Sequence, residues 1–234
     1  MKIITVLKFT VCLTIASFSL ASDADISNGQ VLPELACRYE MHIVPQDKSQ
    51  TEIHKTWYFW RTANSVQTQD ADGGHGEIWQ RSTTGNIQYR KLYHNDKTAV
   101  EYMPADNASN NISFDWIKLS SMLSQQELDS LKYVKKSEIM GKRSELRTGK
   151  IDGQSLEVQW LVDEKLPASI IRKDGVRTVE LRLLDIAPLL TTQYKPVSVA
   201  DIGNYRQIDA TDFGDMENDP FVKKLMAVEG QHTH

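Results

Sequence analysis

Six aromatic residues are the strongest candidates for a binding site in the sequence. They are Trp57, Phe59, Trp79, Tyr89, Trp116 and Trp160. Each lies in a segment expected to form a strand or a short helix, and each carries a large apolar surface. Such a set either fills the core between a sheet and its helices or lines a hydrophobic cleft between them. The residue types leave both arrangements open, and the second predicts that all six contact an apolar ligand.

Residues that serve in catalysis elsewhere are scattered in this chain. Cys37 is a candidate nucleophile, but it shares one side of a predicted strand with Tyr39 and Met41, which favours a buried packing thiol. The sequence contains no nucleophile elbow, no His-Glu-x-x-His motif, no phosphate loop and no dinucleotide fingerprint. We therefore predict a protein that is not an enzyme and that uses no cofactor.

Metal-binding residue types are also dispersed. Four histidines fall among the predicted strands and turns, namely His42, His54, His75 and His94. No pair has the close spacing of a local metal site, although His75 and Glu77 share one parity and offer an alternative. Six acids between Asp201 and Asp219 miss the ligand spacing of a calcium loop. We predict no metal site and interpret this segment as solvated surface with helix caps.

The first 21 residues have the features of a secretory signal peptide. Lys2 supplies a positive charge, an apolar run from 9 to 20 follows, and Ser19 and Ala21 fit cleavage after Ala21. That run is shorter than the ~20 residues of a membrane-spanning helix. The mature chain is expected in the periplasm, or secreted from another kind of cell, without stable membrane insertion. A net charge of −4 argues against a nucleic-acid partner.

Alternation with a period of two dominates the middle of the chain. Leu156, Val158 and Trp160, for example, alternate with Ser155 and Glu157. Short Asp-Gly turns join successive strands, which excludes a parallel α/β sheet. We predict a mainly β (α+β) fold with roughly nine strands. It is a curved antiparallel β-meander forming an incomplete barrel, with a short helical insertion and a C-terminal acidic and helical extension.

Composition and capping signals divide the chain. Ser124 and Glu127 form a capping box inside the helical insertion. Asp219 followed by Pro220 marks the start of a short terminal helix. The expected parts are a signal peptide at 1–21, an antiparallel β-sheet domain at 22–187 with its helical insertion near 113–132, and an acidic extension at 188–234.

Two segments resemble elements of a known family. The stretch from Arg143 to Trp160 is similar to a hairpin with a small-residue turn and a strand carrying Val and Trp, and Leu166–Arg172 is similar to a Leu-Pro element followed by a basic strand. Both occur in the LolA/LolB-like periplasmic lipoprotein-carrier superfamily, which the chain resembles over 36–184. The resemblance implies an incomplete barrel, covered by helices, that holds acyl chains. The acidic extension after Pro188 departs from the family pattern.

Two functional hypotheses follow. The first is an exported, non-enzymatic binding or carrier protein for an apolar ligand, such as a lipid or a lipoprotein acyl chain. The second is a periplasmic accessory protein that docks a protein partner through the Asp201–Asp219 segment. An open cleft beside the sheet favours the first hypothesis, and a closed, filled core favours the second.

Overall fold

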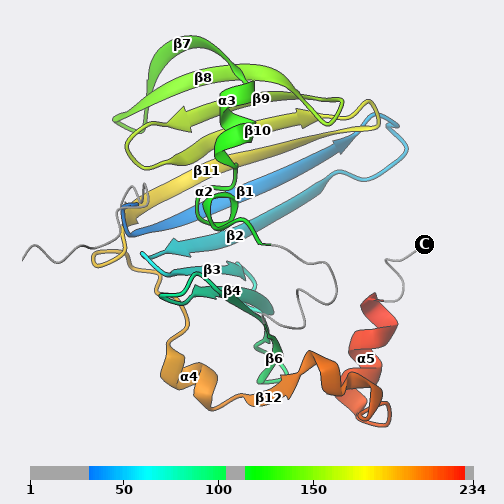
Figure 1. Cartoon of the computed structure of the whole chain (residues 1–234). Helices are drawn as coiled ribbons and strands as arrows, with labels where there is room; N and C mark the ends of the chain where they lie inside the picture. The colour runs from blue at the N-terminus through cyan, green and yellow to red at the C-terminus, as the bar shows by residue number, and fades with distance from the viewer. Residues whose placement is uncertain (1–31, 104–113, 230–234) are drawn as a thin grey trace, which may run out of the picture. The chain divides into compact units, whose positions relative to one another are not determined.

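The computed structural model describes residues 32–103 and 114–229, and the expected signal peptide lies outside these ranges. Within them, twelve strands form one sheet (Figure 1). In chain order the strands are β1 (Leu35–Pro45), β2 (Ile53–Arg61), β3 (Ser65–Asp70), β4 (His75–Arg81), β5 (Ile87–Tyr93), β6 (Thr98–Tyr102), β7 (Lys132–Ile139), β8 (Lys142–Ile151), β9 (Gln154–Leu161), β10 (Leu166–Lys173), β11 (Arg177–Pro188) and β12 (Arg206–Asp209).

Two runs of hairpins meet in the middle of the sheet. The strand order is β12-β6-β5-β4-β3-β2-β1-β11-β10-β9-β8-β7, and the pairs are antiparallel except for the parallel pair β12–β6. The joint is the pairing of β1 with β11 from Leu35↔Pro188 to Pro45↔Arg177. Among the described residues β12 and β7 do not pair with each other, so the sheet stays open. This confirms the predicted antiparallel, incomplete barrel, and the described strands exceed the roughly nine expected from the sequence pattern.

The pleat separates two faces of the sheet, because successive side chains point to opposite sides. Register places Cys37 opposite Phe59 and Tyr39 opposite Trp57 on one face. The rings of Tyr39 and Trp57 stack, with 5.2 Å between their centroids. The alternate residues of β2, such as Trp60, point to the other face. Aromatic residues of both parities in β2 therefore lie on both faces of the sheet.

Two short helices cover the first face. They are α2 (Trp116–Ser121) and α3 (Gln125–Ser130), and Figure 1 shows both lying in front of the strands. The predicted capping box is confirmed, since Ser124 accepts from the Glu127 amide and Glu127 accepts from the Ser124 amide. Trp116 packs into the core cluster that contains Tyr39 and Phe59. Leu128 packs into a second cluster, which contains Trp160.

One buried arginine ties these elements together. The side chain of Arg61, at the end of β2, is 0% exposed. Its guanidinium donates to four backbone carbonyl oxygens, at 2.7 Å to Ser120, 2.6 Å to Glu164, 3.1 Å to Pro33 and 3.3 Å to Lys165. Burial lowers the pKa of Arg61 to about 10, which still leaves it protonated at neutral pH. The contacts join the end of α2, the β9–β10 turn and the chain before β1 to one strand.

The residues after Pro188 run along the other face and then extend the sheet. The Trp60 indole donates to the Tyr194 carbonyl oxygen at 3.1 Å. Further on, Ile202 of α4 (Val199–Gly203) packs against Ile78 and Leu92. The chain then forms β12, the 3₁₀ turn η1 (Ala210–Gly214) and α5 (Pro220–Glu229). Asp219 accepts from the Phe221 amide at 2.9 Å, as its predicted capping role requires. None of the helices in the described ranges has the length and apolar character of a bilayer crossing.

Replacing the buried arginine should destabilise the fold strongly. In Arg61→Met the four carbonyl oxygens lose their donor, and a buried unsatisfied polar group costs about 1–3 kcal/mol. We expect the free energy of unfolding to fall by about 3 kcal/mol or more in urea titrations followed by circular dichroism. The matched control is Arg38→Met on exposed β1 surface, which should change it by less than about 0.5 kcal/mol. Equal losses in the two variants would show that the carbonyl contacts do not support the fold.

Candidate ligand-binding cavity

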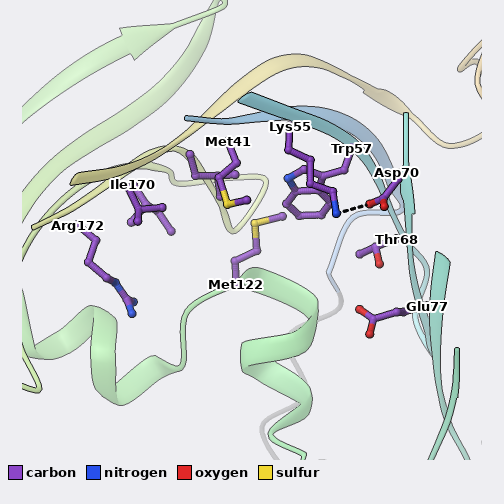
Figure 2. A pocket seen from close by; sticks show the side chains of 11 residues that line it. Met41, Lys55, Trp57, Thr68, Asp70, Glu77, Met122, Ile170 and Arg172 are labelled. Carbon is purple, nitrogen blue, oxygen red and sulfur yellow. Dashed lines mark ion pairs between the residues drawn. The ribbon is translucent and has the colours of Figure 1, made fainter. Parts of the chain in front are cut away.

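A cavity of about 490 Å³ lies between the helix-covered face of the sheet and the end of α2 (Figure 2). Six strands and the residue that follows α2 supply its walls. The lining residues are Met41, Lys55, Trp57, Thr68, Asp70, Glu77, Met122, Ile170, Arg172, Val179 and Leu181. Register explains why they converge, because cross-strand partners share a face: Met41 pairs with Lys55 and Leu181, for example.

The middle of the cavity is apolar. Trp57 forms one part of the wall and stacks on Tyr39 beneath it. Met122 follows α2 with a φ of 66°, and this left-handed cap ends the helix beside the cavity. Figure 2 shows the Met122 side chain pointing from the helix toward Met41 and Trp57. Methionine side chains adapt to irregular apolar surfaces, so two of them facing each other suit a binding wall that must fit a flexible ligand.

One end of the cavity is polar and largely self-paired. Lys55 forms an ion pair with Asp70 at 2.9 Å. Glu77 accepts a hydrogen bond from the Tyr89 hydroxyl at 2.5 Å, and burial together with this carboxylate raises the pKa of Tyr89 well above its ordinary value. A second cavity of about 320 Å³ shares Lys55, Thr68, Asp70 and Glu77 with the first and adds His75, Gly76, Lys91, Leu92 and Tyr93. The two cavities therefore meet at this polar end.

The opposite end carries a cation without a partner. Arg172 lies in β10, and Figure 2 shows it on the far side of Met41 from Asp70 and Glu77. It is half-buried and forms no ion pair or hydrogen bond with another residue in the described ranges. Its register partners are Leu156 and Val179, both apolar. A guanidinium in this position has its donors free for a ligand carboxylate or phosphate.

The structure places the six predicted binding residues in different environments. Trp57 lines the cavity. Phe59, Trp116 and Trp160 are at most 8% exposed and belong to the core clusters. Trp79 and Tyr89 stack on each other with centroids 5.2 Å apart. Five of the six are thus absent from the lining of this cavity, and contact between them and a ligand stays a prediction.

Several lining residues were not predicted from the sequence. Alternation did place Met41 on the same side as Cys37 and Tyr39, and Lys55 has the same parity as Trp57. A lysine in a strand is normally an exposed residue, so this signal alone does not place Lys55 in a cavity. The partners that complete the wall, such as Ile170 and Leu181, come from strands far away in sequence.

The other candidates for chemistry have structural roles. Cys37 is fully buried in the core cluster, which confirms the predicted packing thiol. His75 is exposed and its Nδ1 lies 3.8 Å from an Asp70 oxygen, whereas Glu77 is engaged by Tyr89. In the acidic segment, Asp209 caps η1, and backbone donation from Thr211 lowers its pKa.

Comparison with known proteins reaches only the fold. No family model and no curated protein matches the sequence. The solved structure of PNGF-II is similar to it with a TM-score of 0.39 and 11% identity, and the match covers 78% of this chain and 33% of PNGF-II. MucB is similar with a TM-score of 0.36 and 11% identity, over 73% of this chain and 57% of MucB. A LolA superfamily protein from Nitrosomonas europaea is similar with a TM-score of 0.33 and 10% identity, over 66% of this chain and 85% of that protein. This chain thus spans about a third of PNGF-II. These folds include the LolA-like fold that the sequence resemblance predicts. Because the TM-scores are low, the function of this chain has to be argued from its own residues.

The Cys37 thiol should be inert in the folded protein. Burial raises its pKa to about 12, so the reactive thiolate is negligible at pH 8. In a Cys12→Ser chain, which keeps Cys37 alone, we expect no reaction with Ellman's reagent at pH 8 until urea unfolds the protein. Rapid labelling of the native chain would instead indicate an accessible, activated cysteine.

Proposed function

We propose that the chain is a non-enzymatic, periplasmic carrier or binding protein for an amphipathic ligand with an acyl chain, such as a lipid or the lipid part of a lipoprotein. The observation that carries the proposal is the cavity between sheet and α2, with an apolar middle and charged ends. Its volume falls within the 300–1,000 Å³ range typical of small-molecule pockets. The predicted signal peptide supports the location.

The apolar wall supports the acyl part of the ligand. Met41, Trp57, Met122, Ile170, Val179 and Leu181 supply six of the lining side chains. Apart from the indole N–H of Trp57 they carry no strong hydrogen-bonding group, whereas each buried CH₂ group of a ligand contributes about 0.8 kcal/mol. Affinity therefore comes from chain length rather than from a specific reacting group.

The ends of the cavity support an anionic head group. Lys55 is neutralised by Asp70, and Glu77 is occupied by Tyr89, so the polar end is internally satisfied. Arg172 is the lining cation that has no partner among the described residues. A carboxylate or phosphate next to the acyl chain would pair with it.

One observation supports the second hypothesis, in which a protein partner docks on the Asp201–Asp219 segment. In the Asp201–Asp219 segment, Asp212, Asp215 and Glu217 are exposed and form no ion pair with another described residue. The remaining acids, however, have local roles: Asp219, for example, caps α5 and pairs with Arg206 at 2.7 Å. A carrier must deliver its ligand to another protein, so the three exposed acids are proposed as a contact for such a partner.

Affinity should rise with the length of the acyl chain. For octanoate, decanoate and dodecanoate, we expect each step of two CH₂ groups to lower Kd about tenfold in calorimetric titrations. Burying the two added groups contributes about 1.6 kcal/mol to the binding free energy. Val179→Trp fills the cavity and should abolish the binding. Its matched control, Val176→Trp, places the same ring at a position that is 70% exposed and should bind normally. Equal affinities along the series, or normal binding by Val179→Trp, would contradict the proposal.

Recognition of the anionic head group of the ligand should depend on Arg172. We expect Arg172→Gln to weaken dodecanoate binding about tenfold, since a hydrogen bond to a charged group contributes about 1.5–3 kcal/mol and solvent screens part of it here. Dodecanol, which has no charge, should lose little affinity. Lys173→Gln is the control, because Lys173 is the exposed neighbour on the opposite face. A similar loss for the acid and the alcohol would show that Arg172 does not recognise the anion.

A further inference from the structure

A compact group of three metal-binding side chains lies at the β1–β2 hairpin. His42 of β1 and His54 of β2 are direct cross-strand partners. Their imidazole rings stack, with centroids 3.9 Å apart and an interplanar angle of 19°. Glu52, one residue before β2, places its Oε2 atom 2.8 Å from His42 Nε2 and 3.9 Å from His54 Nε2. The three ligand atoms all lie within 4.8 Å of one another.

This arrangement is independent of the cavity. The neighbouring residues Met41 and Lys55 line the cavity, so the pleat directs His42 and His54 to the opposite face of the same strand pair. The histidines were considered as metal ligands from the sequence and set aside, because residues 42 and 54 are not local neighbours. The hairpin register brings them together.

The distances are close to those of a metal site. Zinc is held by imidazole nitrogens and carboxylate oxygens at about 2.0–2.2 Å, so ligand atoms on a tetrahedral ion stand about 3.4 Å apart. The two distances from Glu52 to the histidines, 2.8 and 3.9 Å, lie on either side of that value. The Glu52 and His54 side chains are more than half exposed, so they can shift by about half an ångström to complete the set. Two imidazoles and one carboxylate leave a fourth position for water, as in three-ligand zinc sites.

The surroundings favour a cation. Within the described residues, the ion-pair partners of Glu52 are the two histidines, and no lysine or arginine neutralises it. Glu180 of β11 is the register partner of His42 on its other side, and its carboxylate is occupied by Arg182 at 2.8 Å. Glu40, two residues before His42, faces the same side. Carboxylates therefore flank the group, and the guanidinium of Arg182 is already paired with Glu180.

We propose that His42, Glu52 and His54 bind one divalent transition-metal ion, with Zn²⁺ as the expected occupant. Imidazole nitrogen suits Zn²⁺, Cu²⁺ and Ni²⁺, whereas Mg²⁺ and Ca²⁺ prefer sites built from oxygen alone. The ion would join β1 to the start of β2 across the hairpin and so stabilise the native state by mass action.

The test is a calorimetric titration of the full chain with ZnCl₂. His232 and His234, which lie outside the described residues, are replaced by Asn in every sample to remove adventitious binding at the tail. We expect one Zn²⁺ per chain, a raised Tm with Zn²⁺ and no heat with MgCl₂. His42→Asn, His54→Asn and Glu52→Gln should each raise Kd at least about tenfold. His75→Asn, which removes an exposed histidine elsewhere, should leave Kd unchanged.

Two results would overturn the proposal. One is the absence of zinc binding at pH 7.5 in the tail-substituted chain. The other is a Kd in His54→Asn or Glu52→Gln that equals that of the His75→Asn control. Because His54 and Glu52 are more than half exposed, these variants should keep the unfolding midpoint of the metal-free protein, so a lost signal reports binding rather than folding.

Discussion

The hydrogen bonds of Arg61 position the end of α2, and Met122, which follows that helix, lines the cavity. A buried guanidinium needs acceptors for its donors, and here backbone carbonyl oxygens from three separate segments supply them. One acceptor is the Ser120 carbonyl at the end of α2, where the partial negative charge of a helix C-terminus favours a cation. A six-residue helix has little stability of its own, so this contact and the packing of Trp116 fix its position on the sheet.

The cavity follows from where α2 ends. Met122 takes the left-handed conformation directly after the helix, and its side chain closes one side of the space above Trp57. The sheet opposite is a continuous wall because β1 and β11 pair, which brings Leu181 and Val179 next to Met41. Where the helices pack tightly the same face is a filled core, and beyond α2 it is open. One face thus contains both the core and the cavity that the sequence left as alternatives.

The sequence predicts what depends on near neighbours. Alternation predicted the strands and the inward position of Cys37, and the capping box predicted α3, because each depends on residues within a few positions. Pairing between distant strands is not contained in a period of two. The β1–β11 joint, the parallel β12 and the meeting of His42 with His54 therefore emerged only from the fold. Similarly, an aromatic residue in a strand is recognisable, but whether Phe59 fills the core while Trp57 lines a cavity depends on where a helix stops.

The most direct measurement is mass spectrometry of the lipids that accompany the protein through purification, for wild type and for Val179→Trp. An acyl-binding cavity predicts an anionic amphiphile at up to one molecule per wild-type chain and its loss from the variant, in which the ring occupies the space. A wild-type protein free of amphiphiles, or equal amounts in both proteins, would contradict the assignment of this cavity to a lipid ligand.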